Sequence, residues 1–131
     1  MHLKYKSYIK IVSILCFACI ISQSSLSLQA QPFKQEILQF QKSDSIVMPP
    51  MGQIVFAGSS SFTKWKDVVM YFPGYPIINR GFGGAHIAHV NYHFNQVVKP
   101  YKPKAIVFFC GTNDLAALKS PSETFSDFKT F

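Results

Sequence analysis

The chain's clearest strand signal is the stretch KAIVFFCGTND, residues 104–114. Residues 104–109 are predicted as a strand: after Lys104 they form an apolar run that does not alternate with polar residues, which is typical of a strand in a parallel sheet covered on both faces. The strand is expected to end at Cys110, because the residues that follow, Gly111-Thr112-Asn113-Asp114, are turn formers. This stretch therefore predicts a buried strand with polar side chains at its carboxyl end.

Two earlier segments have the same organisation. Residues 53–57 (QIVFA) are a short apolar run followed by Gly58-Ser59-Ser60-Ser61. Ile77-Ile78-Asn79 is followed by the glycine-rich segment Arg80-Gly81-Phe82-Gly83-Gly84. We expect each run to be a strand that ends in an unusual loop.

Helical patterns lie before, between and after these strands. Residues 32–44 and 85–98 have apolar residues at helical spacing, whereas 62–72 look helical or irregular. Ser120-Pro121-Ser122-Glu123 is a capping box that starts a last helix. The alternation predicts an α/β fold with three α/β/α layers and a parallel sheet joined by right-handed crossovers. The loops 58–61, 80–84 and 110–114 would then meet at the carboxyl edge of the sheet, where such folds bind ligands.

Residues 1–30 have the pattern of a secretory signal peptide. Three lysines and no acidic residue precede or flank an uncharged apolar run at 11–21, and small and polar residues follow as far as Ala30. The run is shorter than the about 20 residues that a transmembrane helix needs. An uncleaved anchor and a lipidated Cys19 are the alternatives. We expect an exported protein whose domain comprises residues 31–131.

The remaining composition argues against nucleic-acid binding. The 131 residues include 13 Lys+Arg and 6 Asp+Glu, for a net charge of +7. Without Lys4, Lys6 and Lys10, ten basic residues face six acidic ones, a net of +4, and the remaining lysines are scattered. Cys110 is the one cysteine beyond residue 30, so no intrachain disulfide is expected in the domain. The length favours one domain.

Each loop has residues suited to acyl transfer, and each also has a simpler explanation. A serine directly after a buried strand suits a nucleophile, but serine is also a preferred helix N-cap. Glycines in 80–84 let backbone N–H groups approach a ligand, or they form an ordinary turn. The Asn113 side chain can donate to an oxyanion or close an Asx turn.

Taken together, the loops resemble the first three characteristic blocks of the SGNH (GDSL-type) hydrolases, in order and at strand ends. The blocks are Gly58-Ser59-Ser60, Asn79-Arg80-Gly81-Phe82-Gly83-Gly84 and Gly111-Thr112-Asn113-Asp114, and the resemblance covers about residues 50–131. It implies a flavodoxin-like fold and ester hydrolysis without a metal or an organic cofactor. It also implies that Ser60 is the nucleophile and that the Gly84 N–H and the Asn113 side chain are oxyanion-hole donors, together with the N–H of Ser60.

The resemblance also implies a block that this sequence lacks. The family's base is a His oriented by an Asp three residues earlier, and no aspartate of this chain has a His at that spacing. We therefore expect residues 31–131 to be the N-terminal portion of one such domain, present as a truncated chain. The alternative is a non-catalytic pseudoenzyme or binding module that keeps the oxyanion pocket.

Three histidines, His86, His89 and His93, recur along the helix predicted at 85–98. Such a stripe can bind Zn²⁺ or Ni²⁺, which would make the chain a metal-binding protein. The simpler interpretation is a partly exposed helix face without a ligand role. We assign no metal site to it.

The sequence thus predicts a periplasmic or secreted serine esterase that acts on small acyl esters, either acetylated carbohydrates or lipids. The expected partner is that substrate, with neither nucleic acid nor a membrane span after signal cleavage. Three parallel strands leave a sheet edge bare. We therefore expect the isolated chain to oligomerise or aggregate.

Overall fold

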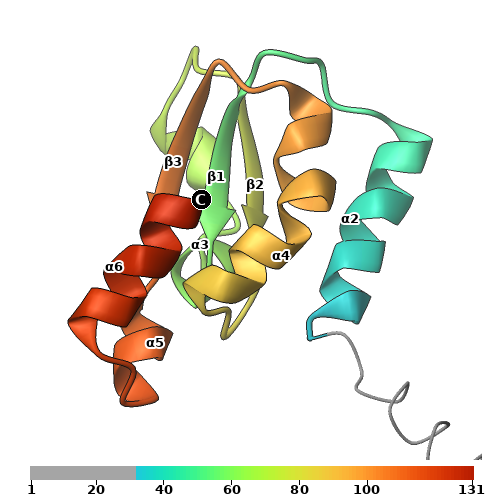
Figure 1. Cartoon of the computed structure of the whole chain (residues 1–131). Coiled ribbons are helices and arrows are strands. Elements are labelled where there is room, and N and C mark those ends of the chain that lie inside the picture. Colours follow the sequence, from blue (N-terminus) through green and yellow to red (C-terminus); the bar gives the residue numbers. More distant parts are fainter. Residues whose placement is uncertain (1–31) are drawn as a thin grey trace, which may run out of the picture. The chain divides into compact units, whose positions relative to one another are not determined.

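Residues 32–131 form a three-stranded parallel sheet with helices on both faces. The structure is a computed structural model that describes these residues; the predicted signal peptide at 1–30 lies outside them. The strands are β1 (Ile54–Gly58), β2 (Ile77–Gly81) and β3 (Ala105–Phe109), in the order β2-β1-β3. The predicted α/β fold with a parallel sheet is confirmed (Figure 1).

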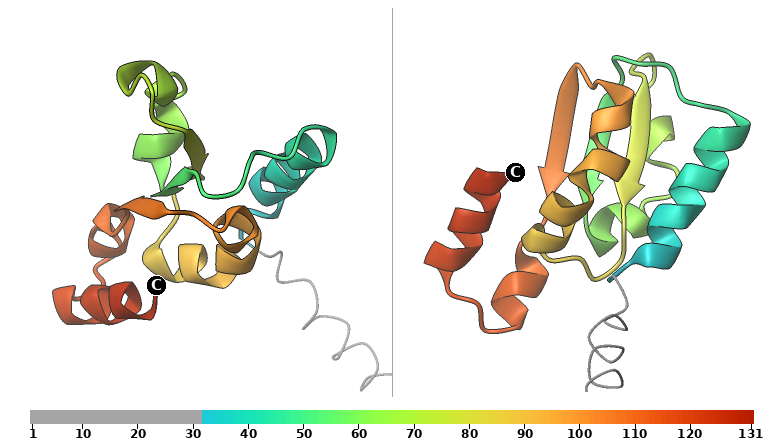
Figure 2. Two further views of the ribbon diagram at one scale, coloured as in Figure 1. Left: turned by 90° about the horizontal axis from the view of Figure 1, so that it is seen from above. Right: turned by 45° about the vertical axis from the view of Figure 1, so that its right-hand side comes forward.

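The helices make the layers on either side of the sheet. α3 (Ser60–Lys64) and the 3₁₀ helix Val68–Tyr71 cover one face, and α4 (Ile87–Val97) and α6 (Pro121–Thr130) lie on the other (Figure 2). The remaining helical elements are α2 (Lys34–Ile46), a 3₁₀ turn at Lys99–Tyr101 and α5 (Thr112–Ala116). None of the helices in residues 32–131 is long and apolar enough to cross a membrane.

Side chains of β1 alternate between two apolar cores, as the period-two geometry of a strand requires. Val55 and Ala57 belong to the core on the α4 side, whereas Phe56 packs with Phe62 and Val68 on the α3 side. All five side chains are buried. Burial of each large one stabilises the fold by about 1.5–3 kcal/mol, which explains why the short apolar runs in the sequence become the centre of the sheet.

Several elements differ from their predicted bounds. β2 continues to Gly81 rather than ending at Asn79, because parallel pairing with β1 engages the backbone of Arg80 and Gly81. The stretch predicted as a turn at 111–114 contains the start of α5, which follows Gly111 in a left-handed conformation at φ 118°. The last helix begins as predicted: Glu123 N–H donates to Ser120 Oγ, and Ser120 N–H donates to Glu123 Oε2.

An ion pair that the sequence did not reveal fastens α2 to the sheet. Arg80 on β2 donates from Nη2 to Asp44 Oδ1 at 2.5 Å and from Nε to the Tyr101 hydroxyl at 2.6 Å. The Tyr101 hydroxyl donates in turn to Asp44 Oδ2. The Arg80 guanidinium also stacks over the Phe40 ring of α2. This cluster compensates for the small apolar contribution of α2, which buries one residue, Ile37.

β3 is the least covered strand of the sheet. Ile106, Val107 and Phe109 are 39%, 40% and 52% exposed. Beside them an apolar groove of about 360 Å³ runs between β3, α5 and α6 and is lined by residues such as Phe108, Leu115 and Phe128. The prediction of a buried strand in this stretch is therefore wrong: β3 is an edge strand whose apolar side chains are largely exposed.

Candidate active site

The three predicted loops leave the sheet from one row of paired residues. Gly58 of β1 is the register partner of Gly81 on β2 and of Phe109 on β3. Hydrogen bonds extend this row by one residue: Ser59 N–H donates to Phe109 O at 3.2 Å, and Phe82 N–H donates to Gly58 O at 3.1 Å. Adjacent strands lie about 4.8 Å apart, so the loops begin close together at the carboxyl edge.

Glycine is required at two positions of this row. A Cβ at Gly58 would stand 2.1 Å from Phe109 O, and a Cβ at Gly81 would stand 2.5 Å from Cβ of Phe62. Both distances are far below van der Waals contact. The glycines therefore let β3 and α3 approach the central strands closely where the loops begin.

Ser60 is the first residue of α3, where a backbone N–H has no partner within the helix. The N-cap position is held by Ser59, which is buried, and its side chain makes no cap hydrogen bond. A serine thus occupies the N-cap position of α3, as the simpler explanation expects, but without the side-chain hydrogen bond that a serine cap usually makes. Ser60 itself is half-buried, between buried Ser59 and exposed Ser61.

Asn79 fixes α3 against β2. Its Nδ2 donates to the carbonyl oxygens of Phe62 at 2.7 Å and Trp65 at 3.1 Å. Its Oδ1 accepts from Gly81 N–H at 3.0 Å. The first residue of the second block thus determines where the helix that begins at Ser60 lies, a role that the sequence analysis did not assign.

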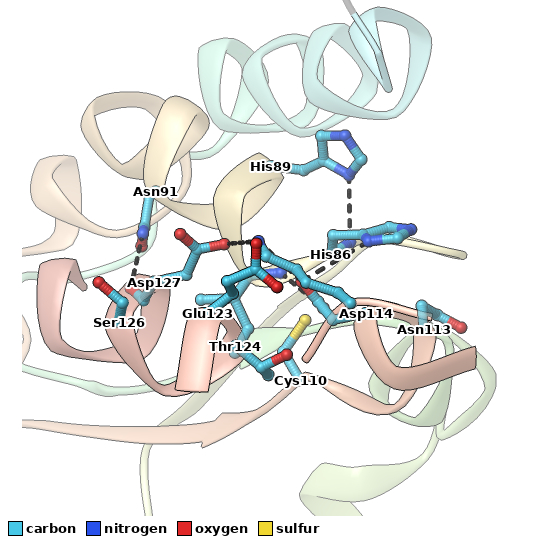
Figure 3. A network of polar contacts seen from close by, with 12 residues as sticks. His86, His89, Asn91, Cys110, Asn113, Asp114, Glu123, Thr124, Ser126 and Asp127 are labelled. Atoms are coloured by element: carbon cyan, nitrogen blue, oxygen red, sulfur yellow. Dashed lines mark hydrogen bonds and ion pairs between the residues drawn. The ribbon is translucent and has the colours of Figure 1, made fainter. Parts of the chain in front are cut away.

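Two of the loops are joined by side chains from the segment 110–114. Asn113 Nδ2 donates to Ala85 O at 2.9 Å, and Cys110 Sγ donates to the same oxygen at 3.3 Å. Asp114 Oδ2 accepts from Ile87 N–H, the first of α4, at 3.1 Å (Figure 3). The Asn113 amide has two N–H groups, so one is left for another acceptor.

Asp114 is the polar residue at this site that the sequence analysis missed. Its side chain is fully buried, and Oδ1 has no hydrogen bond within residues 32–131. His86 Nδ1 and Lys119 Nζ each lie 3.6 Å from that oxygen. Lys119 also pairs with Asp127. The sequence feature that could have indicated a role for Asp114 is its position directly after Asn113.

The histidines of α4 and its N-cap do not form one exposed face. His93 is buried, with Nε2 2.8 Å from Pro32 O and Nδ1 3.3 Å from Gln96 Oε1, so the expected exposed stripe is wrong there. His89 Nδ1 accepts from His86 N–H at 3.1 Å, and burial together with neighbouring His86 lowers the pKa of His89. Among residues 32–131, no three potential ligands are grouped to hold a metal ion.

Cys110 is not activated as a nucleophile. Burial raises the pKa of its thiol to about 11. The thiolate is the reactive form of cysteine, and it is scarce near neutral pH at such a pKa. Of the nucleophilic side chains at this rim, the hydroxyl of Ser60 is therefore the better candidate.

Comparisons with known proteins give similarity in structure alone. No family model matches the sequence, and no curated protein matches it. A Streptococcus pneumonia protein described as a platelet activating factor aligns with a TM-score of 0.62 and 16% identity over 86% of this chain and 51% of its own.

Two Bacteroides structures are also similar. A GDSL-like lipase from Bacteroides thetaiotaomicron VPI-5482 aligns with a TM-score of 0.60 and 21% identity, over 72% of this chain and 49% of its own. A Bacteroides fragilis NCTC 9343 protein described as an acylhydrolase aligns with a TM-score of 0.55 and 22% identity, over 78% of this chain and 49% of its own. The chain spans about half the length of each of these proteins. Residues 32–131 therefore have the fold of GDSL-like lipase and acylhydrolase structures.

Proposed function

We propose that this chain carries the nucleophile and the oxyanion hole of an exported serine ester hydrolase. The observation that supports the proposal best is the single register row, Gly58, Gly81 and Phe109, from which the three loops begin. A few residues beyond that row, the loops after the three strands carry the proposed site residues, Ser60 after β1, Gly84 after β2 and Asn113 after β3. The fold shared with a lipase and an acylhydrolase supports the same reading.

In the proposed reaction, Ser60 Oγ attacks the carbonyl carbon of an ester. The carbonyl oxygen becomes an oxyanion, which accepts hydrogen bonds from the N–H groups of Ser60 and Gly84 and from the second N–H of Asn113. Collapse of the tetrahedral intermediate expels the alcohol and leaves an acyl-enzyme, which water hydrolyses. No metal or organic cofactor takes part.

The proton of Ser60 needs an acceptor, and the described residues do not identify one. None of Asp44, Asp67, Asp114 and Asp127 has a His three residues later. The second candidate function is a binding module that keeps the oxyanion pocket without turnover, because no hydrogen bond joins Ser60 to a histidine within residues 32–131. The proposed substrates are small acyl esters of carbohydrates or lipids, and the proposed location outside the cytoplasm rests on residues 1–30.

Fluorophosphonate labelling tests the proposal. The probe should modify Ser60 in the wild-type chain, and Ser60→Ala should abolish labelling, while Ser61→Ala, a matched change at the exposed neighbour, should not. Asn113→Ala should slow labelling by about 10²- to 10³-fold, the usual cost of losing one oxyanion donor. Labelling that persists in Ser60→Ala, or none in the wild type, would contradict the hydrolase and leave the binding module.

A further inference from the structure

We propose that Asp114 is a positioning residue that holds the loop carrying Gly84 in register with the Asn113 side chain. This inference rests on the proposed function, because it concerns the two oxyanion donors assigned there. Asp114 itself would touch neither the substrate nor the oxyanion. It would act through the backbone that leads from Gly84 into α4.

The loop is held at each peptide after Gly84. Ala85 N–H donates to Phe82 O at 3.4 Å, and Ala85 O accepts from the Asn113 side chain. Ile87 N–H donates to Asp114 Oδ2. Asn113 and Asp114 are consecutive residues in the first turn of α5. One helical turn therefore makes hydrogen bonds to two backbone groups of the segment after Gly84.

Without Asp114, the Ile87 N–H at the start of α4 would lose its side-chain acceptor. A local capping box joins the N-cap residue His86 to His89, whose side chain accepts from His86 N–H, but it does not engage Ile87 N–H. The first N–H groups of a helix have no partner within it, and a carboxylate is favoured there by the helix dipole. Asp114 therefore supplies, from 27 residues away, an acceptor for the Ile87 N–H, which the local bond from His86 N–H to His89 does not serve.

The carboxylate of Asp114 is buried, which favours a fixed position for its contact with Ile87 N–H. Its side chain is fully buried, and its free oxygen faces His86 and Lys119, each at 3.6 Å. A buried carboxylate with an unbonded oxygen is costly unless a nearby positive group, here the Lys119 ammonium, compensates it. Lys119 lies on the segment between α5 and α6, so the same carboxylate also connects that segment to the loops.

Labelling kinetics separate this role from general stability. Asp114→Ala should lower the maximal rate of Ser60 labelling, kinact, by about 10- to 100-fold, below the 10²–10³ of a lost donor, with KI nearly unchanged. Asp114→Asn keeps an oxygen for Ile87 N–H and should restore most of the rate. Asp127→Ala removes the other carboxylate that pairs with Lys119 and should leave kinact at the wild-type value.

A second readout does not depend on catalysis. Amide hydrogen exchange at Ile87 should accelerate in Asp114→Ala but not in Asp114→Asn or Asp127→Ala, and the amide resonance of Gly84 should shift with it.

If the wild type is not labelled at Ser60, the proposed function fails and the exchange experiment still decides the positioning role. If Asp114→Ala does not fold, Asp114→Asn decides: retained protection at Ile87 with lost labelling would overturn the proposal. Equal kinact in Asp114→Ala and Asp127→Ala would also overturn it.

Discussion

Cys110 has a structural role at the candidate active site although its side chain is nucleophilic in other settings. It follows β3 directly, and its thiol donates to Ala85 O, the same oxygen that Asn113 binds. Burial is the main cause that raises its pKa to about 11, while a hydrogen bond from the backbone of Gly111 acts in the opposite direction. The side chain therefore packs and donates in the thiol form.

Alkylation measures this state. In the folded chain, Cys110 should react with iodoacetamide about 100-fold more slowly at pH 7.5 than in the urea-unfolded chain, because a pKa two units higher leaves about one hundredth of the thiolate. The rate should keep rising with pH until about 11. Mass spectrometry of the Cys110 peptide separates it from the other cysteines. Equal rates in the folded and unfolded chains would contradict the burial.

Among the elements, α2 depends on a polar anchor rather than on a broad apolar face. Ile37 is its one buried residue, whereas Asp44 reaches Arg80 and Tyr101. Burial, together with the hydrogen bond to Asp44, raises the pKa of Tyr101 from 10.0 to about 12. Because the folded state favours the protonated phenol, this contribution to stability is complete below pH 10 and is lost as pH rises towards 12.

Denaturation at alkaline pH tests the anchor. The free energy of unfolding should fall more steeply between pH 10 and 12 in the wild type than in Tyr101→Phe, by about 2–3 kcal/mol at most, since one pKa unit corresponds to about 1.4 kcal/mol. Tyr101→Phe should also be less stable at neutral pH, where Asp44 and Arg80 lose a partner. Tyr75→Phe, a change at an exposed tyrosine, is the control and should retain the wild-type slope. Urea titrations followed by circular dichroism give the values.

At the scale of the whole molecule, the sheet is protected unevenly. Within residues 32–131, β1 lies between two strands, whereas β3 pairs on one side and carries exposed apolar residues without a charge or a proline in the strand. Natural sheets usually blunt such an edge with charges, prolines or a covering segment. The exposed side chains of Phe125 and Phe128 on α6 line the apolar groove between β3, α5 and α6.

We expect this edge to make the isolated chain self-associate. Val107→Lys places a charge on the exposed part of β3 and should shift the chain towards monomer in sedimentation velocity runs over a range of concentrations. Met70→Lys changes an exposed apolar residue outside β3 and should have no such effect. A wild-type chain that stays monomeric at every concentration, or an equal effect of both variants, would contradict the role of β3.

Local signals in the sequence determined the three strands, the capping box at Ser120 and the order of the loops, because hydrophobic runs, turn residues and caps act over a few neighbours. Tertiary structure alone decided which distant polar groups meet. Asp44 reaches Tyr101 across 57 residues, Asp114 reaches Ile87 across 27, and His93 is buried rather than exposed. Such contacts depend on the register that sets Gly58 beside Gly81 and Phe109, and no local pattern specifies which side chains that register brings together.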